Sequence, residues 1–289
     1  MQRFRPKSVK SAFRWLILTA VVFFLVQTLQ KHWEEVTRLR ITAAGVACLA
    51  IALGITLFAH IFAGYVWSWI LRFLSYRVSG AWGAQTYLKT NIAKYLPGNV
   101  WHFYGRVNAA KQIGIAIAPA TLSLLLESLL MAAAACFFAI AGFHSWLQLG
   151  IAIVILISVH PFFLNLVLRK LKKTEPVQID RYPLLPFAGE LGFLGLRSIG
   201  FVLVFLALRP IAGSELPLLI SGFAWAWLLG FVIPGLPGGV GVFEVIAVAI
   251  FSQQFPTAQV IGAVTLYRFI NTLAEGLGAG LAAIDSSTR

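Results

Sequence analysis

Residues 42–71 read TAAGVACLAIALGITLFAHIFAGYVWSWIL, and this stretch decides the fold class. It contains no Asp, Glu, Lys or Arg, and it is longer than the ~20 apolar residues that an α-helix needs to cross a bilayer. Trp67 and Trp69 stand near its end, where aromatic side chains anchor a span at the membrane interface. The stretch therefore predicts a transmembrane helix.

The whole chain has the composition of a membrane protein. Of its 289 residues, 59% are apolar and 11% are charged, whereas soluble domains contain about 25% charged residues. This excludes a soluble enzyme, a disordered chain and a nucleic-acid-binding module, and it allows at most roughly eight spans. The pattern predicts an all-α, polytopic helical bundle that forms a single transmembrane domain over residues 1–289. The expected spans lie near 13–30, 42–71, 117–143, 146–168, 191–208, 216–233 and 258–284.

Two broken segments, near 86–100 and 234–251, interrupt this series of spans. Pro97 and Gly98 break the first segment, and a run rich in Pro and Gly opens the second. The apolar part of the second segment, residues 242–251, is short for a crossing. The chain has seven spans if this segment is re-entrant and eight if it crosses the bilayer.

The distribution of charge predicts an orientation. The net charge of +13 comes mainly from basic blocks within 3–14, 72–111 and 169–181. Basic loops stay on the cytoplasmic side, so we expect a multi-pass protein of the cytoplasmic (inner) membrane with a cytoplasmic N-terminus. In such a chain the high positive charge indicates attraction to anionic lipids rather than to nucleic acid.

Five ionisable residues fall inside segments expected to lie in the membrane, and each is costly in hydrocarbon without a partner or a polar cavity. Helical spacing places Arg268 and Glu275 on one face of the last span, together with Asn271. One hypothesis pairs Glu127 with Arg268 in a buried network; the alternative is polar contacts that join the helices and bind no ligand. The five residues are Glu127, Arg197, Glu244, Arg268 and Glu275.

The broken segments are the other candidates for binding. Cations and aromatic side chains around Lys94, Trp101 and Arg106 suit a phospholipid phosphate at the inner interface, or only anchor the chain there. Backbone amides of the glycine run at 238–241 suit an anionic head group at the start of a helix, or the glycines only allow close packing or a tight turn. Among the five histidines, only His102 lies near other candidate residues.

No motif of a conventional enzyme is found in the chain. It has no His-Glu-x-x-His pair, no Gly-x-Ser-x-Gly turn and no metal-spaced Cys/His cluster. We therefore expect no catalytic residue, no bound metal and no cofactor.

Several motifs together resemble one known family. The stretch from Asn91 through Lys94-Tyr-Leu-Pro-Gly-Asn-Val-Trp101 to Arg106 looks like a hallmark of the lysylphosphatidylglycerol synthase transmembrane-region family. The run from Pro237 to Glu244, the pair Tyr267-Arg268 and the position of Glu127 are similar to further features of that family. The resemblance implies a flippase-like domain with re-entrant segments. Because the chain ends soon after the last expected span, we expect a stand-alone member that lacks the soluble synthetase domain.

The expected function is to bind a phospholipid or a related lipid-linked head group and move it across the cytoplasmic membrane. The alternative is a non-catalytic membrane scaffold for a partner glycosyltransferase or lipid synthase. The residues expected along the head-group path are Lys94, Pro97, Gly98, Trp101, His102, Arg106, Glu127, Pro237, Gly238, Gly239, Gly241, Glu244, Arg268 and Glu275.

Overall fold

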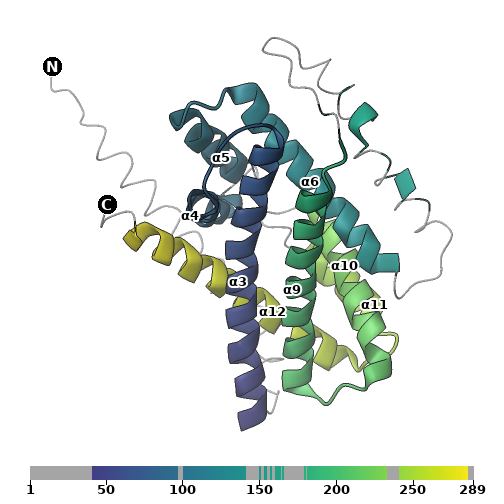
Figure 1. The fold of residues 1–289 in the computed structure, drawn as a ribbon. Helices are drawn as coiled ribbons and strands as arrows, with labels where there is room; N and C mark the ends of the chain where they lie inside the picture. Colours follow the sequence, from purple (N-terminus) through teal and green to yellow (C-terminus); the bar gives the residue numbers. More distant parts are fainter. Residues whose placement is uncertain are drawn as a thin grey trace.

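The computed structural model describes residues 41–96, 100–140, 181–232 and 241–285, together with isolated positions between 150 and 179. All regular structure within these ranges is helical, without a strand. The elements, labelled as in Figure 1, are α3 (Ala43–Phe73), α4 (Gly80–Asn91), η1 (Ile92–Tyr95), α5 (Trp101–Gln112), α6 (Ile117–Ile140), α9 (Leu184–Leu208), η2 (Gly213–Glu215), α10 (Leu216–Val232), α11 (Val242–Phe251) and α12 (Thr257–Asp285).

Local capping defines α3, which covers almost the same residues as the expected span at 42–71. The Thr42 hydroxyl accepts a hydrogen bond of 3.1 Å from the Gly45 amide at the start of the helix. The helix ends where Ser75 adopts a left-handed backbone with φ of 71° and its amide donates to the Arg72 carbonyl. The α4 helix then begins with a second cap, in which the Ser79 hydroxyl accepts from the Trp82 amide.

Four segments in the described ranges have the length and apolar composition to cross a membrane: α3, α6, α9 and Gly213–Val232, which joins η2 to α10. The α11 helix is apolar but shorter. Large apolar side chains such as Val46, Ile51 and Phe58 are more than half exposed on α3, as expected for a surface that faces lipid. These features are those of an all-α membrane protein.

Some expected features lie outside the described residues. They include the span at 13–30, most of the span at 146–168, and residues 234–240 of the second broken segment. Pro97, Gly98, Pro237, Gly238 and Gly239 belong to this group.

The structure corrects one boundary that matters for the site. The span expected at 191–208 begins at Leu184, after Pro183, so α9 is longer by about two turns. Glu190 therefore lies inside the helix, and it is fully buried. The carboxyl group of Glu190 is thus part of the protein interior.

Helices α3 and α9 pack side by side and antiparallel (Figure 1). Their order is visible from two contacts: Gly189 of α9 faces Val66, and Gly200 faces Thr56, which lies earlier in α3. On another face of α3, Gly64 lies directly against the backbone of Ala84 in α4, so the two helices approach closely there. The α12 helix crosses α3 and α9 obliquely (Figure 1).

An aromatic core lies between α9, α10, α11 and α12. The ring of Phe201 is central, with centroid distances of 5.1 Å to Phe223, 5.3 Å to Tyr267 and 5.5 Å to Phe251. Such pairs add to the stability gained from apolar burial. This core forms a wall beside the polar cavity described next, because Tyr267 belongs to both.

Candidate head-group cavity

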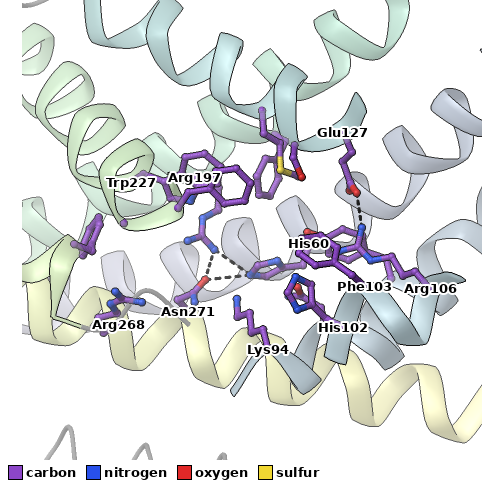
Figure 2. A pocket seen from close by; sticks show the side chains of 18 of the residues that line it. His60, Lys94, His102, Phe103, Arg106, Glu127, Arg197, Trp227, Arg268 and Asn271 are labelled. Atoms are coloured by element: carbon purple, nitrogen blue, oxygen red, sulfur yellow. Dashed lines mark hydrogen bonds and ion pairs between the residues drawn. The ribbon is translucent and has the colours of Figure 1, made fainter. Parts of the chain in front are cut away.

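A polar cavity with a volume of about 360 Å³ lies among α3, α4, α5, α6, α9, α10, α11 and α12. Four cationic side chains line it: Lys94, Arg106, Arg197 and Arg268. Figure 2 shows Arg106 and Arg268 at opposite sides, with Lys94 and Arg197 between them. Segments far apart in the sequence thus bring several positive charges to one space inside the helical bundle.

Arg106 is paired with Glu127, which corrects the hypothesis that Glu127 opposes Arg268. The Arg106 guanidinium donates to Glu127 Oε2 over 2.5 Å, and both side chains are 3% exposed. The guanidinium also lies 4.2 Å from the centre of the Tyr87 ring. The α5 helix packs against α6, and this packing places Arg106 next to Glu127. Arg268 on α12 has a different carboxylate partner.

That partner is Glu244 at the first turn of α11. Arg268 Nε donates to Glu244 Oε1 over 2.6 Å, and the Gly241 amide donates to Glu244 Oε2 over 2.7 Å. Gly241 has a φ of +89°, a backbone conformation that favours glycine. This contact corrects one expectation: the Gly241 amide is occupied by the carboxylate of its own helix and is not open to a ligand.

A second network joins η1, α12, α3 and α9 at the centre of the cavity. Lys94 Nζ donates to Glu275 Oε1 over 2.5 Å, and Asn271 Nδ2 donates to the same oxygen over 3.1 Å. His60 Nε2 lies 3.1 Å from Asn271 Oδ1 and 3.3 Å from Glu275 Oε1. The expected helical face of Arg268, Asn271 and Glu275 therefore does carry polar contacts toward other helices.

Arg197 differs from the other three cavity cations in its partners. Its guanidinium donates to Asn271 Oδ1 and lies 3.0 Å from His60 Nε2 (Figure 2). None of the ion pairs formed among the described residues includes Arg197. Its Nε is buried and has no hydrogen-bond partner in the same ranges. A cation that contacts no carboxylate directly is an attractive position for an anionic ligand.

His102 and Trp101 differ in their position relative to the cavity. Burial lowers the pKa of His102 to about 3, and the nearby Arg106 and Lys94 charges act in the same direction. The imidazole is therefore neutral in the cavity wall and does not attract a phosphate by charge. Trp101 begins α5 but is 42% exposed and is not part of the cavity lining.

Two residues of the interior were missed by sequence reasoning. His60 is a lone histidine in an apolar run, yet it contacts Asn271, Arg197 and Glu275. Glu190 lies just before the span expected at 191–208 and was not among the candidate residues. The signal for Glu190 was its spacing of seven residues from Arg197, which places both on one face of a helix. No comparable signal marks His60, because its partners come from other helices.

In the part of the chain that the structure describes, no group of three or more His, Cys, Asp or Glu side chains is arranged to hold a metal ion. Cys48 and Cys136 are free thiols. The polar groups of the cavity are instead suited to hold charge: guanidinium and ammonium groups, amides and carboxylates.

The chain matches no family in a comparison with models of known protein families. It is similar to an uncharacterized protein of Synechocystis sp., slr0712, with 32% identity over 101 residues. The match covers 33% of this chain and 31% of that relative, so it spans about a third of the relative's length. The cavity is therefore the feature from which a function can be inferred.

Proposed function

We propose that this protein binds an anionic phospholipid or lipid-linked head group in the cavity and moves it across the cytoplasmic membrane. In this proposal the chain crosses the membrane seven or eight times with its N-terminus in the cytoplasm, and it is a flippase-like relative of the lysylphosphatidylglycerol synthase transmembrane region. The proposed relation to that family is based on the resemblance of its motifs and not on the comparison with family models.

Arg197 is the observation that carries this proposal. It lies in α9, a segment apolar and long enough to span a membrane, and its contacts are to neutral groups. A buried cation that forms no direct ion pair is costly, so an anion that reaches it gains a strong charge-assisted hydrogen bond. A lipid phosphate combines that charge with acyl chains that remain in the surrounding bilayer.

The rest of the cavity fits the same ligand. Among the paired cations that line the cavity, Lys94 is the most exposed, with 21% of its side chain accessible, whereas Arg106 is 3% exposed. Phe103, Trp227 and Phe231 add apolar and aromatic surface to the lining. A site with few placed polar groups among apolar side chains is typical of small-molecule binding.

Purified protein in liposomes tests the proposal. Fluorescent phosphatidylglycerol and phosphatidylcholine are reconstituted with it, and lipid movement is followed by a membrane-impermeant reductant that quenches the outer leaflet. We expect faster movement of phosphatidylglycerol than in protein-free vesicles. We also expect Arg197→Gln to slow it by about tenfold, the effect of losing one hydrogen bond to a charged group.

The matched control is Arg209→Gln, at the residue that caps the C-terminus of the same helix. Arg209 pairs with Glu215 at the end of α9 and is not part of the cavity lining, so its loss should leave lipid movement unchanged. Folded wild-type protein that moves neither lipid contradicts the proposal and favours the scaffold. Equal slowing by both substitutions contradicts the role of Arg197.

A further inference from the structure

Glu190 is a buried carboxyl group that the proposed head-group site does not use. It lies on α9 with 0% exposure, and both of its carboxyl oxygens are without a hydrogen-bond partner among the described residues. An ionised carboxylate in such a place has lost its hydration, and no hydrogen bond replaces it. This is among the least favourable arrangements in a protein interior. The position therefore requires either a counter-ion or a proton.

The cation that acts on Glu190 already has a carboxylate partner. Arg106 and Glu127 are the charged groups that act on Glu190, and the Arg106 guanidinium donates to Glu127. The remaining Glu127 oxygen, Oε1, and Arg106 Nε have no partner in the described ranges. Two carboxyl groups thus share a single guanidinium that is hydrogen-bonded to one of them.

Among the residues that the structure describes, the elements packed around α9 offer no second cation to Glu190. From α4, the ionisable neighbour is Tyr87, whose ring stacks on Arg106. The α10 helix contains no ionisable residue. On α3 and α12, His60 and Glu275 belong to the network around Arg197, about two turns along α9 from Glu190.

We propose that Glu190 is a proton-binding site, and that Glu190 and Glu127 together hold one proton around Arg106. The proton binds to a carboxyl oxygen and leaves as a hydrated proton through the cavity that Arg106 and Glu127 line. Because the two carboxyl groups interact with the same guanidinium, they exchange this proton as a unit.

This proton sets the charge of the cavity. Four cations, Lys94, Arg106, Arg197 and Arg268, are balanced by the carboxylates of Glu127, Glu244 and Glu275 when Glu190 is neutral, which leaves one positive charge in excess. Loss of the proton removes that excess. Coupling between the proton and an anionic ligand rests on the proposed function, whereas the proton site itself does not.

Infrared spectroscopy of the purified full-length protein in lipid nanodiscs tests the proton site directly. A protonated carboxylic acid has a carbonyl band at higher frequency than a carboxylate, and the band shifts when water is replaced by D₂O. At neutral pH we expect the wild-type protein to show such a band, and Glu190→Gln to lose it. Glu215→Gln, which removes a carboxylate paired with Arg209 outside the cavity, should retain it.

A second variant keeps the test independent of how well Glu190→Gln folds. In Glu127→Gln, Arg106 has Glu190 as its remaining carboxyl partner, so Glu190 should ionise and the band should also disappear. A wild-type protein without a D₂O-sensitive band, or a full band in Glu190→Gln, overturns the proposal. Either result leaves the lipid-movement measurement unaffected, so the two proposals fail separately.

Discussion

Arg106 on α5 and Glu127 on α6 form an ion pair of 2.5 Å in which both side chains are almost completely buried. The pair joins two helices directly and contributes to the wall of the cavity. Removing one member of a buried pair leaves the other charge without compensation, which typically costs about 3–5 kcal/mol. The two members are not equivalent here, because a second carboxyl group, Glu190, acts on the same guanidinium.

This asymmetry gives the first prediction. Arg106→Gln should lower thermal stability more than Glu127→Gln, because it leaves two carboxyl groups without a cation, whereas the reverse change leaves Arg106 with Glu190. The expected loss for Arg106→Gln is about 3–5 kcal/mol. Thermal unfolding of both variants in one detergent measures the order. Equal losses would show that Glu190 does not replace Glu127.

The second prediction concerns Asn271, which accepts a hydrogen bond from Arg197 and donates one to Glu275. Asn271→Ala should destabilise the fold by about 1–3 kcal/mol, because charged partners lose a hydrogen bond inside the protein. Chemical unfolding measures this loss. The control is Asn108→Ala, at an exposed position of α5, which should have almost no effect on the free energy of unfolding. Comparable losses in both variants would contradict a structural role for the Asn271 amide.

The third prediction uses two glycines of α3. A methyl group on Gly64 would lie 2.9 Å from the Gly83 carbonyl oxygen and in contact with the Ala84 backbone, which cannot easily move away. Gly64→Ala should therefore destabilise the protein by about 1–3 kcal/mol. Gly54 has open space around the same position, so Gly54→Ala should be neutral or stabilising by about 0.5–1 kcal/mol. Thermal unfolding of the pair decides whether α3 and α4 touch as described.

The fourth prediction is a pH dependence from His102. Its pKa is lowered to about 3 in the folded protein, compared with about 6.5 in an unfolded chain. Between these values the unfolded state binds more protons, so stability is complete above about pH 6.5 and falls as the pH decreases toward 3. His102→Gln should reduce this slope. An unchanged slope of unfolding free energy between pH 6.5 and 5 would show that His102 titrates normally.

Long helices were predictable because they depend on local pattern. The apolar run at 42–71 became α3, Ala43–Phe73, and the expected last span at 258–284 became α12, Thr257–Asp285. The α9 helix begins at Leu184, earlier than the span expected at 191–208, because neighbouring helices bury the Glu190 side chain although it is charged. Burial of a charge by tertiary packing leaves little trace in the local sequence.

The composition of the site was more predictable than its pairing. Lys94, Arg106, Glu127, Arg268 and Glu275 were all expected along a polar path, and each lies in or beside the cavity. Which carboxylate meets which cation depends on helix packing: Glu127 meets Arg106 and not Arg268. His60 was missed for the same reason, since its partners lie 137 and 211 residues away along the chain.

The cavity is lined by side chains from both the earlier helices, α3 to α6, and the later ones, α9 to α12. A ligand bound there contacts both parts of the chain, so its binding free energy adds to the free energy of unfolding. At a concentration of 100 times its dissociation constant, a ligand raises the free energy of unfolding by about 2.7 kcal/mol. Melting the protein in the presence of one lipid after another would therefore rank candidate cargoes without any transport assay.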